Sequence, residues 1–175
     1  FPRYHTGYQY GQYHIRGIRP DMQYSMTSVD GSWRFATNSK GFRNTQEFSY
    51  AKLPNTIRVL SLGDSHTQGY EVRQDLTFSA ILERYLNRDA KKAEVINAGV
   101  SGFSTAEALA FLENEGVRYS PDIVVLGFFA NDFEDNLKAG LFDLDAQNRL
   151  TEKRYEHLPG VRIQDIIYSI PGVRW

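Results

Sequence analysis

Cysteine is absent from this sequence of 175 residues, and neither sign of charge is in excess. Without cysteine the chain has no disulfide bonds, no thiolate nucleophile and no cysteine-ligated metal site. Its 20 Lys and Arg against 21 Asp and Glu give a formal net charge of −1, so no overall field directs it to nucleic acid or an anionic membrane. The longest apolar run, residues 123–130, is far shorter than the ~20 residues of a membrane-spanning helix. What remains is the composition of an ordinary globular domain.

Basic and aromatic residues gather near the N-terminus. Residues 1–55 hold seven Lys and Arg against three acidic residues, together with six of the eleven Tyr. Residues 1–20 are rich in Tyr, Gly and Arg without a clear period, and we expect them to form an extended arm. Such an arm offers a surface to a protein partner or a membrane-associated assembly, and packing against its own domain is the alternative.

Two runs of alternating β-type residues flank Asp30-Gly31 within residues 22–38. Because Asp-Gly tolerates positive φ at both positions of a tight turn, a β-hairpin is predicted here. The pattern changes near residue 56. We therefore divide the chain into residues 1–55, an arm and a hairpin, and residues 56–175, an α/β domain with an insertion from about residue 137.

From that boundary onward, strand-like and helix-like segments alternate. Ser104 and Glu107 have the spacing of a capping box, which opens the second helix. The last strand is apolar almost throughout, as expected of a strand covered on both faces. Alternation of this kind implies parallel pairing, right-handed crossovers and a doubly wound α/β sheet. The predicted segments are 56–63 (strand), 77–89 (helix), 93–99 (strand), 104–115 (helix) and 122–132 (strand).

The alternation stops after residue 136. Residues 141–160 are compatible with a small hairpin, and residues 162–170 begin a helix. Three parallel strands make a thin sheet, so we expect this chain to be the first part of a larger domain.

Small or polar residues follow all three predicted strands, at the edge where open α/β sheets bind ligands. They are residues 63–65, 97–102 and 131–132. Each segment alone has an ordinary structural interpretation as a turn, a turn glycine or a helix cap. Their convergence on one edge favours a site that is, or once was, catalytic.

The residue types at this edge fit nucleophilic attack on an acyl carbon. Ser65 is the candidate nucleophile, and Asp64 is positioned to organise the turn around it. The tetrahedral intermediate of such a reaction needs donors aimed at its oxyanion. The backbone N–H groups of Ser65 and Gly102 and the side-chain amide of Asn131 are the candidate donors.

Other motifs fail on their spacing. The α/β-hydrolase elbow requires glycine where Thr67 stands, and no glycine is followed by the residues of a P-loop or a dinucleotide fingerprint. Residues 143–154 resemble a calcium loop, but Asn148 replaces the turn glycine and Arg154 the closing glutamate. The four His have no metal-ligand spacing. We therefore expect no metal and no cofactor.

The three segments resemble the blocks of the SGNH/GDSL hydrolase family. "LGDSHTQG" resembles the first block with Ser65 as nucleophile, "NAGVSGFST" the second with Gly102 as oxyanion glycine, and "GFFAND" the third with Asn131 as oxyanion amide. "NSKGFRN" also resembles a segment that precedes the first block in some bacterial members. The resemblance covers about residues 56–136. It implies a flavodoxin-like three-layer α/β/α fold and hydrolysis of carboxylic esters, often acetyl or acyl groups on glycans or lipids.

One part of the family pattern is missing, namely the Asp-x-x-His block that supplies the general base. His66 adjoins Ser65, so its side chain is expected to point elsewhere, and His157 lacks an aspartate three residues before it. Two interpretations remain. Either the base lies outside this chain, in an esterase that is exported after removal of a segment preceding Phe1, or the chain is a non-catalytic subunit of a larger assembly. Absence of cysteine suits an extracytoplasmic location.

Overall fold

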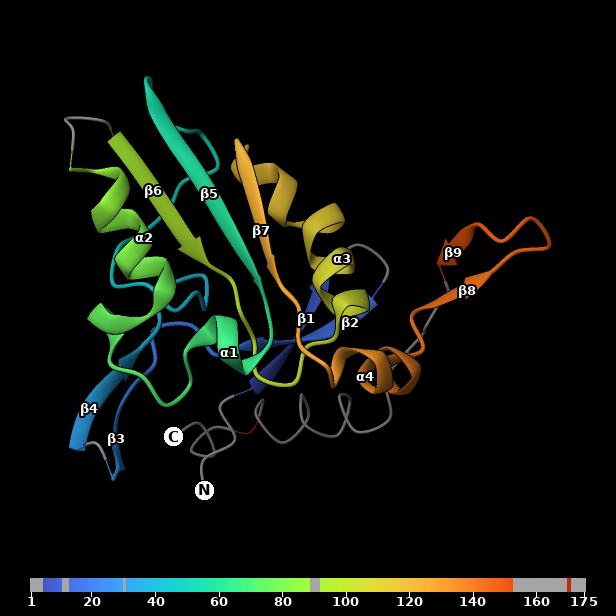
Figure 1. Ribbon diagram of the computed structural model, residues 1–175, viewed down its shortest axis with the longest axis horizontal. Helices are drawn as coiled ribbons and strands as arrows, with labels where there is room; N and C mark the ends of the chain where they lie inside the picture. The colour runs from blue at the N-terminus through green and yellow to red at the C-terminus, as the bar shows by residue number, and fades with distance from the viewer. Residues whose placement is uncertain (1–4, 11–12, 30, 89–91, 153–169, 171–175) are drawn as a thin grey trace.

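The computed structural model describes residues 5–10, 13–29, 31–88, 92–152 and 170. At its centre is a parallel sheet of β5 (Thr56–Gly63), β6 (Lys92–Asn97) and β7 (Ile123–Gly127). β5 lies between the other two, in the order β6-β5-β7 (Figure 1). This second-first-third order is the one with which flavodoxin-like sheets begin. The predicted α/β class with a parallel sheet is confirmed.

The two crossover helices are α2 (Phe78–Leu86), between β5 and β6, and α3 (Thr105–Asn114), between β6 and β7. Because the two crossovers run in opposite directions across the sheet, right-handed connections place these helices on opposite faces. Side-chain parity agrees: Leu60 and Ile96 share a core cluster with Phe111 of α3, whereas Val59 and Val95 are buried outside that cluster.

Each crossover helix begins at a side-chain cap. The hydroxyl of Thr77 accepts a hydrogen bond from the N–H of Ala80 at the start of α2. At the start of α3, the predicted capping box is present, with Ser104 and Glu107 satisfying each other's backbone amides. Short 3₁₀ turns complete this part of the chain, η1 (Gln74–Leu76) before α2 and η2 (Gly116–Tyr119) after α3.

The third strand differs from its prediction. β7 was expected to be covered on both faces, but Ile123, Val124 and Leu126 are each between 42% and 50% exposed. β7 is the edge of the sheet, and in the described part of the chain no further strand pairs with it. Its apolar sequence is that of a central strand, and its exposure is that of an edge strand.

The N-terminal residues correct a second expectation. Residues 5–10 and 13–18 are not an extended arm, because they form β1 (His5–Tyr10) and β2 (Tyr13–Ile18), which pair antiparallel and lie against α3. Ile15 and Ile18 are buried in the same core as α3, and burial of these two apolar side chains explains why the segment packs. The hairpin predicted around Gly31 is confirmed as β3 (Gln23–Ser28) and β4 (Gly31–Ala36).

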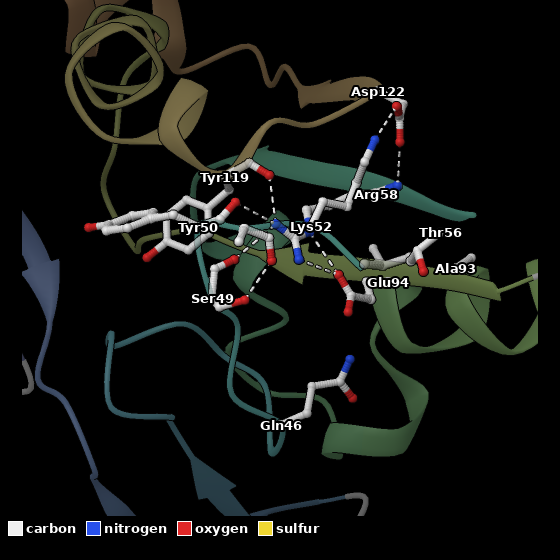
Figure 2. A network of polar contacts seen from close by, with 12 residues as sticks. Gln46, Ser49, Tyr50, Lys52, Thr56, Arg58, Ala93, Glu94, Tyr119 and Asp122 are labelled. Carbon is white, nitrogen blue, oxygen red and sulfur yellow. Dashed lines mark hydrogen bonds and ion pairs between the residues drawn. The ribbon is translucent and has the colours of Figure 1, made fainter. Parts of the chain in front are cut away.

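The segment before β5 is tied to the sheet by Arg58, whose side chain is buried. Figure 2 shows its guanidinium pointing toward the carboxylate of Glu94 and the backbone oxygens of Ser49 and Tyr119. The guanidinium donates to these three oxygens at distances of 2.7 to 3.0 Å. The backbone N–H of Arg58 donates to Asp122 at 2.7 Å. A buried guanidinium needs this many acceptors, and together they join residues 49–50 to β5, β6 and the start of β7.

The chain continues after β7 with α4 (Asp132–Ala139) and a small antiparallel pair, β8 (Phe142–Leu144) and β9 (Leu150–Glu152). This pair confirms the hairpin expected after residue 140. The helix predicted within residues 162–170 lies outside the described residues, apart from its last position. Among the helices that are described, none has the length and apolar character needed to cross a membrane.

Candidate active site

Ser65 is the first residue of α1 (Ser65–Gln68), a single helical turn that follows β5 directly. Asp64 is the N-cap of this turn: its carboxylate is buried and accepts a hydrogen bond from the N–H of His66 at 2.9 Å. Gly69 ends the turn at φ +66°, a left-handed conformation that glycine adopts without strain. The strand, the cap and the terminating glycine therefore fix where Ser65 lies.

The loop after β6 contacts α1 on one side. The side-chain amide of Asn97 donates to the backbone oxygen of Thr67 at 3.0 Å, and the hydroxyl of Ser101 donates to the side chain of Gln68 at 2.7 Å. Gly99 approaches so closely that an added Cβ would lie 2.4 Å from the backbone nitrogen of Gln68. This close approach explains the glycine and holds the loop that carries Gly102 beside α1.

The loop after β7 contacts α1 on another side. The side chain of Thr67 fills the space between Gly63 and Gly127, where an added Cβ at either glycine would lie 2.3 Å from its Oγ1. The ring of Phe129 lies 4.2 Å from the ring of His66, centroid to centroid. All three strand ends that the sequence singled out therefore meet around α1 (Figure 1).

Ser65 and Gly102 open onto different hollows of the surface. Ser65 lines an open pocket of about 330 Å³ together with His66, Tyr70 and Val72. Gly102, at φ +78°, lines a second pocket of about the same volume, between α3 and α4. The pocket beside Ser65 has room for a small ester. Besides Ser65 and His66, its lining consists of residues 69–72.

Asn131 occupies the N-cap position of α4. Its side-chain N–H donates to the carboxylate of Asp135 at 2.6 Å, while its Oδ1 is buried with no hydrogen-bond partner. The carboxylate of Asp132 accepts from the backbone N–H of Phe129 at 2.7 Å, which closes the turn between β7 and α4. Asn131 thus offers a second N–H beyond the one given to Asp135.

His66 is paired with the cap of its own helix. Its Nδ1 lies 3.1 Å from both carboxylate oxygens of Asp64, and its side chain is 62% exposed. His157 lies outside the described residues. Within the described part of the chain, no three His, Cys, Asp or Glu side chains are grouped to hold a metal ion.

Sequence reasoning missed Arg43, which lies in the "NSKGFRN" segment. Its guanidinium is buried, stacks 4.3 Å from the ring centroid of Phe35 and donates to the side chain of Gln74. Burial lowers the pKa of Arg43 to about 10. It also donates to three backbone oxygens of the loop beside Ser65, those of Gln68, Gly69 and Val72. The quoted motif marked the segment, but nothing in the sequence identified the loop that Arg43 holds.

The adjacent Asn44 was also missed. Its side chain accepts a hydrogen bond from the N–H of Asn97 at 2.8 Å and donates to the backbone oxygen of Val95 at 3.0 Å. The free edge of β6 is thereby occupied by a side chain just before the loop that leads to Gly102.

Comparisons with known proteins find a matching family model and proteins similar to part of this chain. The model of the GDSL-like Lipase/Acylhydrolase family matches residues 61–173, more than half of the chain. An arylesterase from Vibrio mimicus is 32% identical over 75 residues, which cover 43% of this chain and 38% of that protein. AlinE4, an SGNH-hydrolase family esterase, is 30% identical over 51% of this chain and 46% of its own, with a TM-score of 0.36. The structure of an AlinE4 mutant is 27% identical over the same shares, with a TM-score of 0.38. The chain thus spans less than half the length of these relatives.

Proposed function

Since this chain belongs to the GDSL-like lipase/acylhydrolase family, we propose that it carries the nucleophile and the oxyanion donors of a serine ester hydrolase. The observation that carries the proposal is the position of Ser65, at the start of a capped turn on which the loops from β6 and β7 converge. The substrates we propose are carboxylic esters, with acyl or acetyl groups on a glycan or lipid.

In the proposed reaction, Ser65 Oγ attacks the ester carbonyl carbon and gives its proton to a general base. The carbonyl oxygen becomes an oxyanion, which accepts hydrogen bonds from the N–H groups of Ser65 and Gly102 and from the Asn131 amide. The bond from carbon to the alcohol oxygen then breaks, and the alcohol leaves with the proton. Water hydrolyses the acyl-serine in the same way and restores Ser65.

We propose that the general base comes from outside the described residues. A serine hydroxyl is a weak nucleophile without an adjacent base. His66 is poorly suited to this role because neighbouring positions on a helical turn do not face each other and its Nδ1 is directed at Asp64. The exposed apolar side chains of β7 are consistent with further chain packing at that edge, beside Asn131.

Labelling by a fluorophosphonate probe tests the proposal in the full protein as its gene encodes it. We expect covalent labelling of the wild type and none of Ser65→Ala. Ser101→Ala is the matched control, since Ser101 lies next to the same turn and its hydroxyl is engaged with Gln68. Absence of labelling in the wild type, or equal labelling of Ser65→Ala, would overturn the assignment of Ser65. A series of p-nitrophenyl esters from acetate to decanoate would then define the acyl group.

The second proposal concerns location. We propose that the protein acts outside the cytoplasm, because a sequence without cysteine suits that environment and esters of glycans and lipids are found there. Fractionation of cells expressing the full protein, followed by detection with an antibody, tests this. Recovery in the cytosolic fraction alone would contradict it.

A further inference from the structure

Asp135 lies one helical turn after Asn131, and the two side chains are in contact. The Asn131 amide nitrogen donates to Oδ2 of Asp135 at 2.6 Å. An amide nitrogen carries two hydrogens, and fixing one in a plane fixes the direction of the other. Because the Asn131 amide is the proposed side-chain donor to the oxyanion, its orientation decides whether that second hydrogen points at the reacting oxygen.

The helix that carries Asp135 is itself held in place. The next residue, Asn136, accepts hydrogen bonds through its side-chain oxygen from the backbone N–H of Ala106 at 2.8 Å and from the hydroxyl of Thr105 at 2.9 Å. These partners are the first residues of α3, so α4 is fastened to the start of α3. The position of Asp135 is therefore fixed relative to α3, so its carboxylate can hold the Asn131 amide in one orientation.

The negative charge of Asp135 is balanced by Lys138, which lies near the carboxylate oxygen that does not contact Asn131. Its Oδ1 lies 3.3 Å from Nζ of Lys138, which also pairs with Glu134 at 3.0 Å. These contacts, the one to Glu134 first, hold the pKa of Lys138 above its usual value, so the ammonium stays charged. An uncompensated carboxylate near a developing oxyanion would oppose catalysis, and the neighbouring ammonium reduces this repulsion.

We propose that Asp135 is a positioning residue for the oxyanion amide: it accepts one hydrogen of Asn131 and thereby aims the other at the substrate. This inference rests on the proposed function. Asp135 does not touch the reacting atoms, and its effect passes entirely through Asn131. The i, i+4 spacing of an amide and a carboxylate in "NDFED" is the sequence signal of this pair.

Steady-state kinetics on the full protein with p-nitrophenyl acetate test the proposal. Removing an oxyanion donor costs about 10²- to 10³-fold in kcat, so Asn131→Ala should fall in that range. Asp135→Ala leaves the donor present but unoriented, and we expect kcat to fall about 10- to 100-fold with KM changed less than about twofold. Asp135→Asn keeps an acceptor oxygen at the same place and should stay within about threefold of the wild type.

Two comparisons separate positioning from a general structural role. Asn131→Ala combined with Asp135→Ala should be no slower than Asn131→Ala alone, because the effect of Asp135 requires the amide. Glu134→Ala is the matched control, since it removes a carboxylate from the same helix and the same lysine without touching Asn131. Thermal unfolding reports the fold of each variant. Should Asp135→Ala not fold, Asp135→Glu displaces the acceptor by one methylene and is expected to lower kcat at unchanged KM.

The possible results lead to separate conclusions. Wild-type protein that labels at Ser65 and hydrolyses the ester, while Asp135→Ala keeps full kcat, overturns the positioning role and leaves the proposed function intact. Additive losses in the double variant overturn it as well. Wild-type protein that neither labels nor hydrolyses overturns the proposed function itself, and the positioning role with it.

Discussion

The imidazole of His66 lies between a carboxylate and an aromatic ring: its Nδ1 is 3.1 Å from Asp64, and its ring centroid is 4.2 Å from that of Phe129. An acid–imidazole pair beside a serine resembles two members of a catalytic triad. Here, however, the carboxylate is the cap of the helix on which the histidine sits, and the phenyl ring belongs to the loop after β7. We interpret His66 as a link between α1 and that loop.

Replacement of His66 therefore tests whether it is the general base, a role that its position next to Ser65 and Asp64 would suggest. We expect His66→Gln to lower kcat/KM by less than about tenfold, whereas loss of a general base costs about 10²- to 10⁴-fold. The measurement is ester hydrolysis by the full protein, with Ser65→Ala as the inactive reference. A loss of a thousandfold or more, with the fold intact, would make His66 the base and remove the need for one elsewhere.

A second prediction concerns Arg43, which joins the N-terminal segment to the loop beside Ser65. Hydrogen bonds that involve a charged group contribute about 1.5–3 kcal/mol each, and several backbone oxygens would lose their donor together. We expect Arg43→Met to lower the free energy of unfolding by about 2–4 kcal/mol, measured by urea denaturation. Arg43→Lys should rescue little, because one ammonium cannot span the acceptors of a planar guanidinium. Arg34→Ala, at an exposed arginine of β4, should leave stability nearly unchanged.

The sequence was sufficient to predict the succession of strands and helices along the chain, because the hydrophobic period and the cap residues are local signals. Ser104 with Glu107, and Gly31 after its aspartate, are read from residues within a few positions of each other. The packing of β1 and β2 could not be predicted in this way. Ile15 and Ile18 are isolated apolar residues in a polar segment, and their burial depends on α3, nearly a hundred residues away.

In the candidate site, too, residues with a local signal could be predicted and residues that act through distant contacts could not. Ser65, Gly102 and Asn131 were found because they follow predicted strands, and parallel strands end at one edge. The residues that hold them together act through contacts between distant segments, as Arg43 does with residues 68–72 and Asn97 with Thr67. No period or motif encodes such contacts.

A third prediction follows from the carboxylate of Asp122 at the opposite end of the sheet. It accepts hydrogen bonds from Lys52 and from the backbone N–H of Arg58, the first being the larger cause that lowers its pKa below the ordinary value of 3.8 (Figure 2). A carboxyl group whose pKa is lower in the folded state stabilises the fold above its unfolded pKa and loses that contribution as pH falls through the folded value.

We therefore expect stability to decline as pH falls below about 4, and Asp122→Asn to decline less steeply over the same interval. Urea denaturation at pH values from 2 to 6 measures both. Glu113→Gln is a suitable control, because Glu113 is an exposed carboxylate of α3 for which the described residues provide no hydrogen-bond or ion-pair partner. Identical slopes for the wild type and Asp122→Asn would contradict the prediction.

The last prediction concerns Gly127 at the end of β7, where α1 packs against the sheet. A Cβ at this position would lie 2.3 Å from Oγ1 of the buried Thr67, which hydrogen-bonds to the backbone oxygen of Leu62 and has little freedom to move. Overpacking of this kind costs about 1–3 kcal/mol. We expect Gly127→Ala to lower stability by that amount and to slow fluorophosphonate labelling of Ser65, because α1 must shift to admit the methyl group.

Thr67 offers an internal check on this cause. Thr67→Ala removes Oγ1 and should restore labelling when it is combined with Gly127→Ala, whereas Thr67→Ser retains the clashing atom and should not. The same two substitutions in the wild-type background measure the loss of the threonine itself, so the combined variants can be compared with them directly. Equal behaviour of the Ala and Ser combinations would show that the effect of Gly127→Ala does not arise from contact with Oγ1, and the tight packing of α1 against β7 would then not be what holds Ser65 in place.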